Sequence, residues 1–397
     1  MSRLIDLSAT PIVDAHCHSY LETPTTLTGD EFARHASMAV QPNFLQSNGS
    51  ETQIRRSHER LYEIYREQPY FKYLISMLAK FFNCPPNLTA VTENRNARAR
   101  DFDTYVKQLF EDMHISGLVM DGGYPPLSQN DLNRFPAKVV SIFRLETFIS
   151  ELLERHDNFN NFCTDYESGI REAIKSKYHV GLKTIIAYRT GLRIRRVPTE
   201  VAKNEFLQAK NGTAERAWFG PKVKPLRDFL IIRALELSVE LDIPMQFHTG
   251  VGDYDIVMDQ CDPALLYDLL KDEKLRHATV VLVHSGFPNN QNAAWIVSLL
   301  PNVFLDFSLT IPYLNLVGSE RLKEVLQIAP TSKIMYGSDG FNLPELYWLG
   351  AKVGKNVLSK CLSQLCEDGL FSDESARQMA TKILFENANK LYGLNLA

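Results

Sequence analysis

Short apolar runs rich in β-branched residues recur along the chain, and each run ends in polar or glycine residues. Between most of them lie segments whose apolar residues recur at three- and four-residue spacing, which is typical of amphipathic helices. Pro225–Asp242 is the clearest such segment, and Asp262–Glu273 opens with an Asp and a Pro, as helices often do. The runs that we expect to be strands are Ile12–Ala15, Ser116–Met120, Lys138–Phe143, Val180–Ile186, Pro244–Phe247, Thr279–Val283, Val303–Phe307 and Lys333–Tyr336.

Strands and helices that alternate in this way predict an α/β protein with a parallel (β/α)8 barrel, a TIM barrel. The connection between the first two strands is long, mostly helical in pattern, and rich in arginine and aromatic residues. Bare loops of that length are uncommon. We therefore expect one barrel over residues 1–397, with a helical cap inserted at about residues 20–111. A smaller insertion, Arg193–Lys224, follows the fourth strand.

Composition and charge narrow the class of protein. The net charge of -4 gives no general attraction to nucleic acid or to an anionic membrane, so we expect neither as a partner. The six cysteines show no paired spacing, which favours free thiols in a reducing compartment. We find no apolar run of about 18 residues and no signal-peptide core at the N-terminus. We therefore expect a cytoplasmic protein that acts on a small molecule, with a homodimer as the base-rate assembly.

Chemically active side chains stand where the expected strands end, which is the face of such barrels that carries function. The first strand runs into His16 and His18, which lie two residues apart and so point to the same side. The fifth strand ends at His248, the sixth at His284 and the eighth at Asp339. Imidazole and carboxylate are ligands of zinc and also suit manganese or iron. The pattern predicts a divalent metal site.

The third and fourth strands bring cationic residues to the same face. The third strand leads to Arg144 and then Glu146, and the fourth contains Lys183 and leads to Tyr188 and Arg189. A guanidinium binds a carboxylate through two parallel hydrogen bonds. We therefore expect Arg144, Arg189 and Tyr188 to bind a carboxylate of the substrate. The alternative is an ion pair within the protein, for example between Arg144 and an acid near Glu146.

These landmarks resemble the amidohydrolase superfamily, and within it the "amidohydrolase 2" branch of metal-dependent barrel hydrolases. They look most like the amidohydrolase domain that fluffy/nodulin-type proteins of fungi and plants carry ahead of a glutamine-synthetase-like domain, which has no counterpart in these 397 residues. The strings that carry the resemblance are VDAHCH (13–18), GLKTIIAYRTGL (181–192), QFHTGVGD (246–253), VLVHSGFP (281–288), VFLDFS (303–308) and IMYGSDGFNLPELYWLGA (334–351).

The resemblance implies a role for each of these side chains. It makes His16, His18, His248 and Asp339 the metal ligands. It makes His284 either a further ligand or the general acid/base beside the metal. Lys183 lies in the strand whose lysine some superfamily members carbamylate to bridge two ions. The other possibility is an ion pair of Lys183 inside the barrel, and the sequence leaves both open.

The resemblance also implies a reaction. A divalent metal activates a water molecule, Asp339 moves its proton as general base and then acid, and His284 helps to polarise the carbonyl. We expect hydrolysis of the C–N bond of a carboxylate-bearing amide, by analogy a γ-glutamyl-type amide. The alternatives are a nonoxidative decarboxylase, a lactone hydrolase and, in a different class, an inactive barrel that only binds or regulates.

Overall fold

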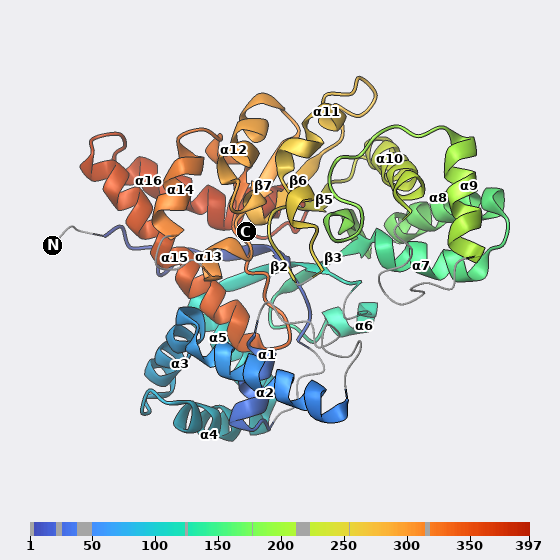
Figure 1. The fold of residues 1–397 in the computed structure, drawn as a ribbon. Coiled ribbons are helices and arrows are strands. Elements are labelled where there is room, and N and C mark those ends of the chain that lie inside the picture. The colour runs from blue at the N-terminus through green and yellow to red at the C-terminus, as the bar shows by residue number, and fades with distance from the viewer. Residues whose placement is uncertain are drawn as a thin grey trace.

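Eight parallel strands form the centre of the protein in this computed structural model, and they neighbour one another in sequence order (Figure 1). The structure describes residues 4–20, 26–37, 50–123, 126–176, 178–211, 223–253, 255–313 and 318–397. The TIM barrel and all eight expected strand positions are confirmed. The strands are β1 Ile12–Cys17, β2 Ile115–Asp121, β3 Lys138–Arg144, β4 His179–Thr184, β5 Met245–His248, β6 Val280–Val283, β7 Val303–Asp306 and β8 Ile334–Met335.

The first and last strands meet through the backbone just beyond the short β8. The Ala15 N–H donates to the carbonyl of Tyr336 over 2.9 Å, and the Phe307 N–H donates to the carbonyl of Met335 over 3.1 Å. The β8 region is therefore bonded to β7 on one side and β1 on the other. This contact closes the sheet into a barrel and places the first strand beside the last.

A bulge in β1 re-aims its last residues. Between the pairs Asp14–Leu118 and Cys17–Met120, β1 has one residue more than β2. Val13 and Ala15 belong to the apolar cluster inside the barrel, whereas Cys17 belongs to the outer cluster between strands and helices. An extra residue in one strand changes which face the following side chains point to. Cys17 thus packs outward as a buried apolar side chain.

Helices surround the barrel, and local signals start many of them. Thr28 and Glu31 form a reciprocal capping box at α1, and Pro occupies the first turn of α3, α10 and α15. The helices are α1 Gly29–His35, α2 Glu51–Glu67, α3 Pro69–Phe82, α4 Leu88–Arg98, α5 Phe102–Met113, α6 Gln129–Leu132, α7 Leu145–Arg155, α8 Phe159–Lys175, α9 Thr199–Asn211, α10 Lys224–Glu240, α11 Tyr267–Leu270, α12 Asn290–Leu299, α13 Thr310–Tyr313, α14 Gly318–Leu326, α15 Pro344–Glu367, α16 Asp373–Thr381 and α17 Asn387–Leu391.

One expected helix is shorter than its pattern suggested. Asp262 does cap a helical segment, because its side chain accepts from the Ala264 N–H, and Pro263 follows as anticipated. The segment is a 3-10 turn, Pro263–Leu266, followed by the single-turn α11, and it stops at Leu270 instead of Glu273.

The helical cap between β1 and β2 is confirmed. Helices α1 to α5 occupy this connection, and α2, α3 and α4 gather into a lobe beside the barrel, drawn in blue at the bottom of Figure 1. The expected cap includes residues 21–25 and 38–49, which lie outside the described residues. In the smaller expected insertion, α9 packs on α10, and residues 212–222 are outside the description.

A buried ion pair fastens the cap to the barrel. Glu345, in the first turn of α15, accepts from Arg95 Nε of α4 over 2.9 Å and from the Tyr105 hydroxyl of α5 over 2.8 Å. Both charged side chains are fully buried. α15 follows the eighth strand directly, so this contact ties α4 and α5 to the segment that leaves the barrel mouth.

The C-terminal segment contributes side chains to the apolar core inside the barrel. Phe385, Tyr392 and Leu394 join Val13, Val119 and Val281 in one buried apolar cluster, together with Ala15, Ile142, Val283, Met335 and Ala388. The inner core is therefore completed by residues that lie beyond the last strand.

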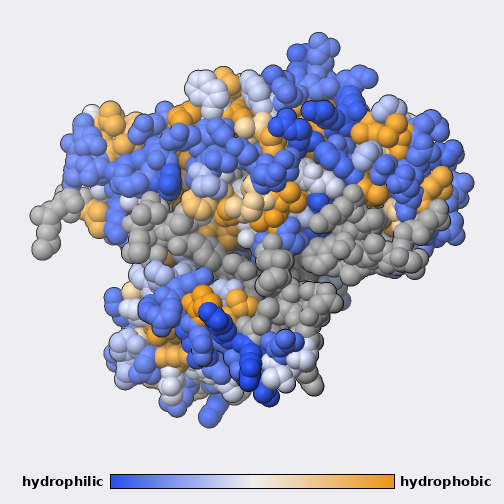
Figure 2. All heavy atoms as spheres, viewed as in Figure 1, coloured by the Kyte–Doolittle hydropathy of each residue, from blue (hydrophilic) through white to orange (hydrophobic). Residues whose placement is uncertain are grey.

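The face of the protein drawn in Figure 2 is mostly polar where its residues are described. On the face drawn in Figure 2 hydrophilic residues dominate, and hydrophobic ones form small separate groups. Within the described part of the chain, we find no helix with the length and apolarity needed to cross a membrane.

The buried pair between cap and barrel gives a stability prediction. Arg95→Met or Glu345→Gln leaves one charged or polar group buried without its partner, and each change should lower the free energy of unfolding by about 3–5 kcal/mol. Arg95→Met combined with Glu345→Leu should recover much of that loss. Urea unfolding measures all three. The matched control is Lys107→Met, which breaks an exposed pair with Glu111 and should cost under about 1 kcal/mol. Single variants as stable as this control would contradict the prediction.

Candidate metal centre

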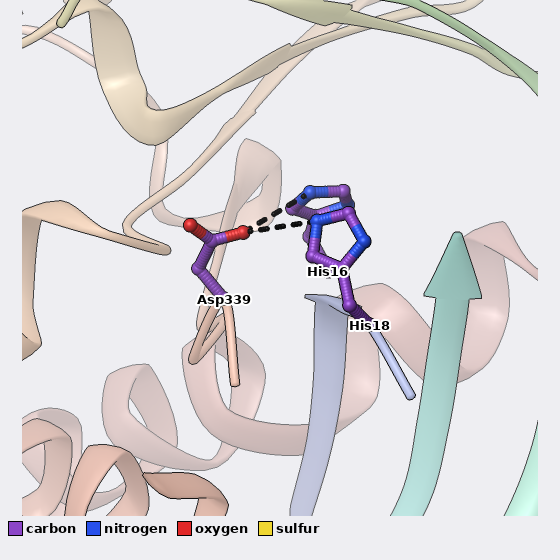
Figure 3. Close-up of side chains that lie close together, drawn as sticks. All are labelled: His16, His18 and Asp339. Atoms are coloured by element: carbon purple, nitrogen blue, oxygen red, sulfur yellow. Dashed lines mark ion pairs between the residues drawn. The ribbon is translucent and has the colours of Figure 1, made fainter. Parts of the chain in front are cut away.

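Three of the predicted ligands converge at the barrel mouth. His16 Nε2 and His18 Nε2 lie 3.4 Å and 3.5 Å from Asp339 Oδ1 (Figure 3). One ligand atom from each residue lies within 4.8 Å of the others. Two imidazole nitrogens and a carboxylate oxygen are a donor set that zinc and similar divalent ions accept. The described residues therefore fit a metal ion at this point.

Backbone hydrogen bonds set the distance between these side chains. The Asp339 N–H donates to the His16 carbonyl over 2.9 Å, and the His18 N–H donates to the Gly340 carbonyl over 2.8 Å. Asp339 has a φ of 58°, in the left-handed region that few non-glycine residues adopt. Such conformations persist where the surrounding contacts enforce them. The carboxylate is thus held against β1 by the main chain itself.

A buried carboxylate holds the same turn from outside the barrel. Asp14 Oδ1 accepts from the Ser338 N–H over 2.9 Å and from the His16 N–H over 3.3 Å, and the carboxylate also accepts from the Ser338 hydroxyl. Burial raises the pKa of Asp14 to about 7. Asp14 joins the residue before Asp339 to the backbone of His16, so it helps to keep the two ligand-bearing segments in register.

His284 is oriented by an equivalent arrangement on β7. Asp306 Oδ1 accepts from the backbone N–H of His284 over 3.1 Å and of Ser308 over 2.9 Å, and it also accepts from the Ser308 hydroxyl. Ser308 donates its hydroxyl proton to Asp306, and Ser308 Oγ lies 2.9 Å from His284 Nδ1. The contact with Ser308 thus helps to orient the His284 ring.

His248 lies beside His284 and not in the three-residue group. His248 Nδ1 is 3.1 Å from His284 Nε2, and the Tyr188 ring centroid is 4.4 Å from that of His248. The Tyr188 hydroxyl accepts from the Asp253 N–H over 3.2 Å. A Cβ at Gly252 would lie 1.9 Å from the Tyr188 oxygen, so the loop after β5 needs glycine there. Tyr188 therefore belongs to this side of the mouth.

Lys183 faces the barrel interior. Its Nζ lies 3.1 Å from His16 Nε2, and the side chain is buried. The sequence could not give this orientation, because the strand ends at Thr184 and a 3-10 turn, Ile186–Tyr188, follows. Burial lowers the pKa of Lys183 to about 8. Lys183 thus lies next to the candidate ligands, and its ε-nitrogen is placed to carry either a carbamate or an ammonium group.

Burial also influences the protonation of Asp339 and of the neighbouring histidine rings. It lowers the pKa of His16 to about 4 and those of His248 and His284 well below their usual range, so these rings are neutral at neutral pH. Neutral imidazole is the form that binds metals. Burial opposes ionisation of Asp339, so this carboxylate depends on positive charge beside it, such as a bound cation, to stay ionised.

The two arginines predicted to bind substrate each have an ion-pair partner in the protein. Arg144 Nη2 pairs with Asp121 Oδ2 at 2.5 Å, and both side chains are buried. Arg189 Nη1 pairs with Asp255 Oδ2 at 2.9 Å. The internal ion pair that the sequence left as an alternative is therefore present for both. Arg144 pairs with Asp121 on the neighbouring strand, whereas the sequence had suggested an acid near Glu146.

Several supporting residues escaped the sequence reasoning. Four of them are polar residues in otherwise apolar strands, as in IVDAHC, MQFH and VFLD, and two are serines just beyond such strands. A buried polar group requires a hydrogen-bond partner, so its presence in such a strand is a signal in itself. The residues are Asp14, Asp121, Gln246, Asp306, Ser308 and Ser338.

Comparisons with known proteins agree with this geometry. A family model described as amidohydrolase matches residues 214–394. Protein fluG of Emericella nidulans is 29% identical over 330 residues, which cover 75% of this chain and 37% of that protein. The chain thus spans little more than a third of the length of this curated relative.

Solved structures extend the likeness to almost the whole chain. A Lactobacillus casei protein described as a metal-dependent hydrolase is 25% identical, with a TM-score of 0.81 and 98% of both chains covered. A uronate isomerase of Thermotoga maritima shares the fold, with a TM-score of 0.66, 13% identity, and 97% and 95% of the two chains covered. The eight-stranded barrel, the family match over residues 214–394 and these likenesses support the resemblance of the chain to the amidohydrolase superfamily.

Proposed function

We propose that this protein is a metal-dependent hydrolase that uses water to cleave the C–N bond of a small amide bearing a carboxylate. The observation that carries the proposal is the convergence of His16 Nε2, His18 Nε2 and Asp339 Oδ1 at the mouth of the barrel. The likeness over 98% of the chain to a protein described as a metal-dependent hydrolase supports it.

His16, His18 and Asp339 would hold the ion. When bound, a divalent metal supplies a Lewis acid that polarises a carbonyl and lowers the pKa of water towards about 7. Zinc is our first choice for this donor set, and manganese or iron also suit it. The His284 ring centroid lies 5.5 Å from that of His16, and His248 lies next to His284, so we propose His248 and His284 as further ligands.

Asp339 is the proposed general base and then acid. One of its carboxylate oxygens points at the two imidazoles and the other points away from them (Figure 3). The second oxygen can take a proton from the attacking water and deliver it to the leaving nitrogen. A cation bound beside it would keep Asp339 ionised before the reaction.

His284 is proposed either as a further ligand or as the general acid/base beside the metal. Its Nδ1 lies 2.9 Å from Ser308 Oγ and its Nε2 lies 3.1 Å from His248 Nδ1, so both ring nitrogens have polar neighbours.

The substrate carboxylate would bind on the side of β3 and β4. We assign it to Arg144 and Arg189, with Tyr188 lining the mouth next to His248. The ion pairs with Asp121 and Asp255 hold the two guanidinium groups in fixed directions. A γ-glutamyl-type amide is the first substrate to test, by analogy with the fluffy/nodulin-type proteins.

Isomerisation of a sugar acid is the second candidate. It is favoured by one observation, the alignment of 97% of this chain, cap included, with a uronate isomerase fold. A decarboxylase and a lactone hydrolase remain further alternatives with the same ligands. An inactive barrel is disfavoured, because His16, His18, His248, His284 and Asp339 are all present.

Metal analysis tests the centre directly. We expect the purified protein to bind one divalent ion per chain, and His16→Ala or Asp339→Asn to lose it, because each removes a ligand. Lys183→Ala should keep one ion. Two ions in the native protein, with one lost in Lys183→Ala, would instead support a carbamate bridge. Retention of full metal by both ligand variants would overturn the metal centre.

Turnover tests the reaction class. The metal-loaded protein should release ammonia or an amine from carboxylate-bearing amides, and Asp339→Asn should lower kcat by at least about 100-fold, because it removes both a metal ligand and the proton carrier. Asp268→Asn, an exposed acid on α11, is the matched control and should leave kcat unchanged. Carbon dioxide release or an isomerised sugar acid in the same screen would identify one of the alternatives.

The carboxylate site has its own test. Arg189→Gln removes a charged hydrogen-bond donor and should raise KM for the acid substrate by about 10- to 100-fold, with a much smaller effect on a neutral analogue. Arg171→Gln breaks an exposed pair with Glu240 and is the matched control. Equal effects on the charged and neutral substrates would show that Arg189 only maintains the structure.

A further inference from the structure

Gln246 is a fully buried polar residue beneath the candidate metal centre. It lies on β5, two residues before His248, and its register neighbours are Lys183 on β4 and Val281 on β6. Val281 belongs to the apolar cluster inside the barrel. A buried amide without partners costs about 1–3 kcal/mol. A long amide at this position therefore needs specific hydrogen bonds.

The hydrogen bonds of Gln246 fix which way its amide points. Gln246 Nε2 donates to the carbonyl of Ala15 over 3.1 Å and to the Tyr392 hydroxyl over 2.8 Å. A backbone carbonyl can only accept, so the NH2 group must face Ala15. The amide oxygen, Oε1, then faces His16 Nδ1 at 3.0 Å. An oxygen that only accepts requires a proton on that ring nitrogen.

The direction of this bond determines which nitrogen of His16 is available to a cation. A neutral imidazole with its proton on Nδ1 carries its lone pair on Nε2. His16 Nε2 is the atom that faces Asp339 Oδ1 at 3.4 Å and Lys183 Nζ at 3.1 Å. The opposite tautomer would turn an N–H towards the centre of the site.

We propose that Gln246 is a positioning residue that holds His16 in the Nδ1–H tautomer, with Tyr392 of the C-terminal segment holding Gln246 in turn. The chain of contacts runs from Tyr392, through the Gln246 amide, to the ring of His16. The inference for metal affinity rests on the proposed metal centre, whereas the inference for the tautomer rests on the hydrogen bonds alone.

NMR of the metal-free protein labelled at the histidine ring nitrogens tests the tautomer. His16→Gln identifies the His16 signals among those of the ten histidines. We expect Nδ1–H for His16 in the native protein. In Gln246→Leu, which has no acceptor, the signals should shift towards the Nε2–H form. An Nε2–H tautomer in the native protein would overturn the inference without any variant having to fold.

Titration of the metal-free protein with zinc tests the consequence. Gln246→Leu should weaken binding by about 10- to 100-fold, as is usual when the partner of a metal-ligating histidine is lost. Gln246→Glu keeps an acceptor for His16 Nδ1 and should restore most of the affinity. Tyr392→Phe should have a smaller effect, because Ala15 still orients the amide. Gln364→Leu, at an exposed position of α15, is the matched control and should bind zinc like the native protein.

The outcomes separate the two proposals. Native protein that binds no zinc through His16 would reject the proposed metal centre, and the NMR result would still decide the tautomer. Native zinc binding with an unchanged tautomer and affinity in Gln246→Leu would reject the role of Gln246 and leave the metal centre standing. Equal losses in Gln246→Leu and Gln246→Glu would also reject it, because a structural defect would explain both.

Discussion

The contact between the end of β1 and the segment after β8 is the constraint on which this site depends. These segments are more than 300 residues apart in the chain, and backbone hydrogen bonds join them at Ala15, His16 and His18. The same bonds that close the barrel therefore place both histidines opposite Asp339. Barrel closure therefore fixes the separation of the three Cα atoms, and the side-chain rotamers then bring the ligand atoms together.

Two buried carboxylates reinforce that geometry in similar ways. Asp14 binds the backbone of His16 and both polar groups of Ser338, and Asp306 binds the backbone of His284 and both polar groups of Ser308. In each case the acid on one strand holds the turn that carries a functional side chain. His284 and Asp339 both have left-handed backbones, and these hydrogen bonds offset the cost of that conformation.

The sequence predicted the strands well, because a parallel barrel buries them on both faces and their apolar runs stand out against helical segments. It also predicted that His16, His18 and Asp339 lie at strand ends, which is a property of the topology. It could not predict the direction of Lys183, since a bulge and a short strand control which face a side chain occupies. Nor could it predict that Arg144 pairs with Asp121, a choice made by register between neighbouring strands.

The hydrogen bonds of the barrel interior link the stability of the fold to the chemistry of the mouth. The apolar cluster that contains Phe385 and Leu394 also contains Tyr392, whose hydroxyl reaches the amide beneath His16. A side chain can set a tautomer only if it is itself immobile, and close packing supplies that immobility. The C-terminal segment thus does more than fill the barrel. By packing there, it supports the orientation that the Ala15 carbonyl imposes on a buried amide, and through that orientation the tautomer of a candidate ligand.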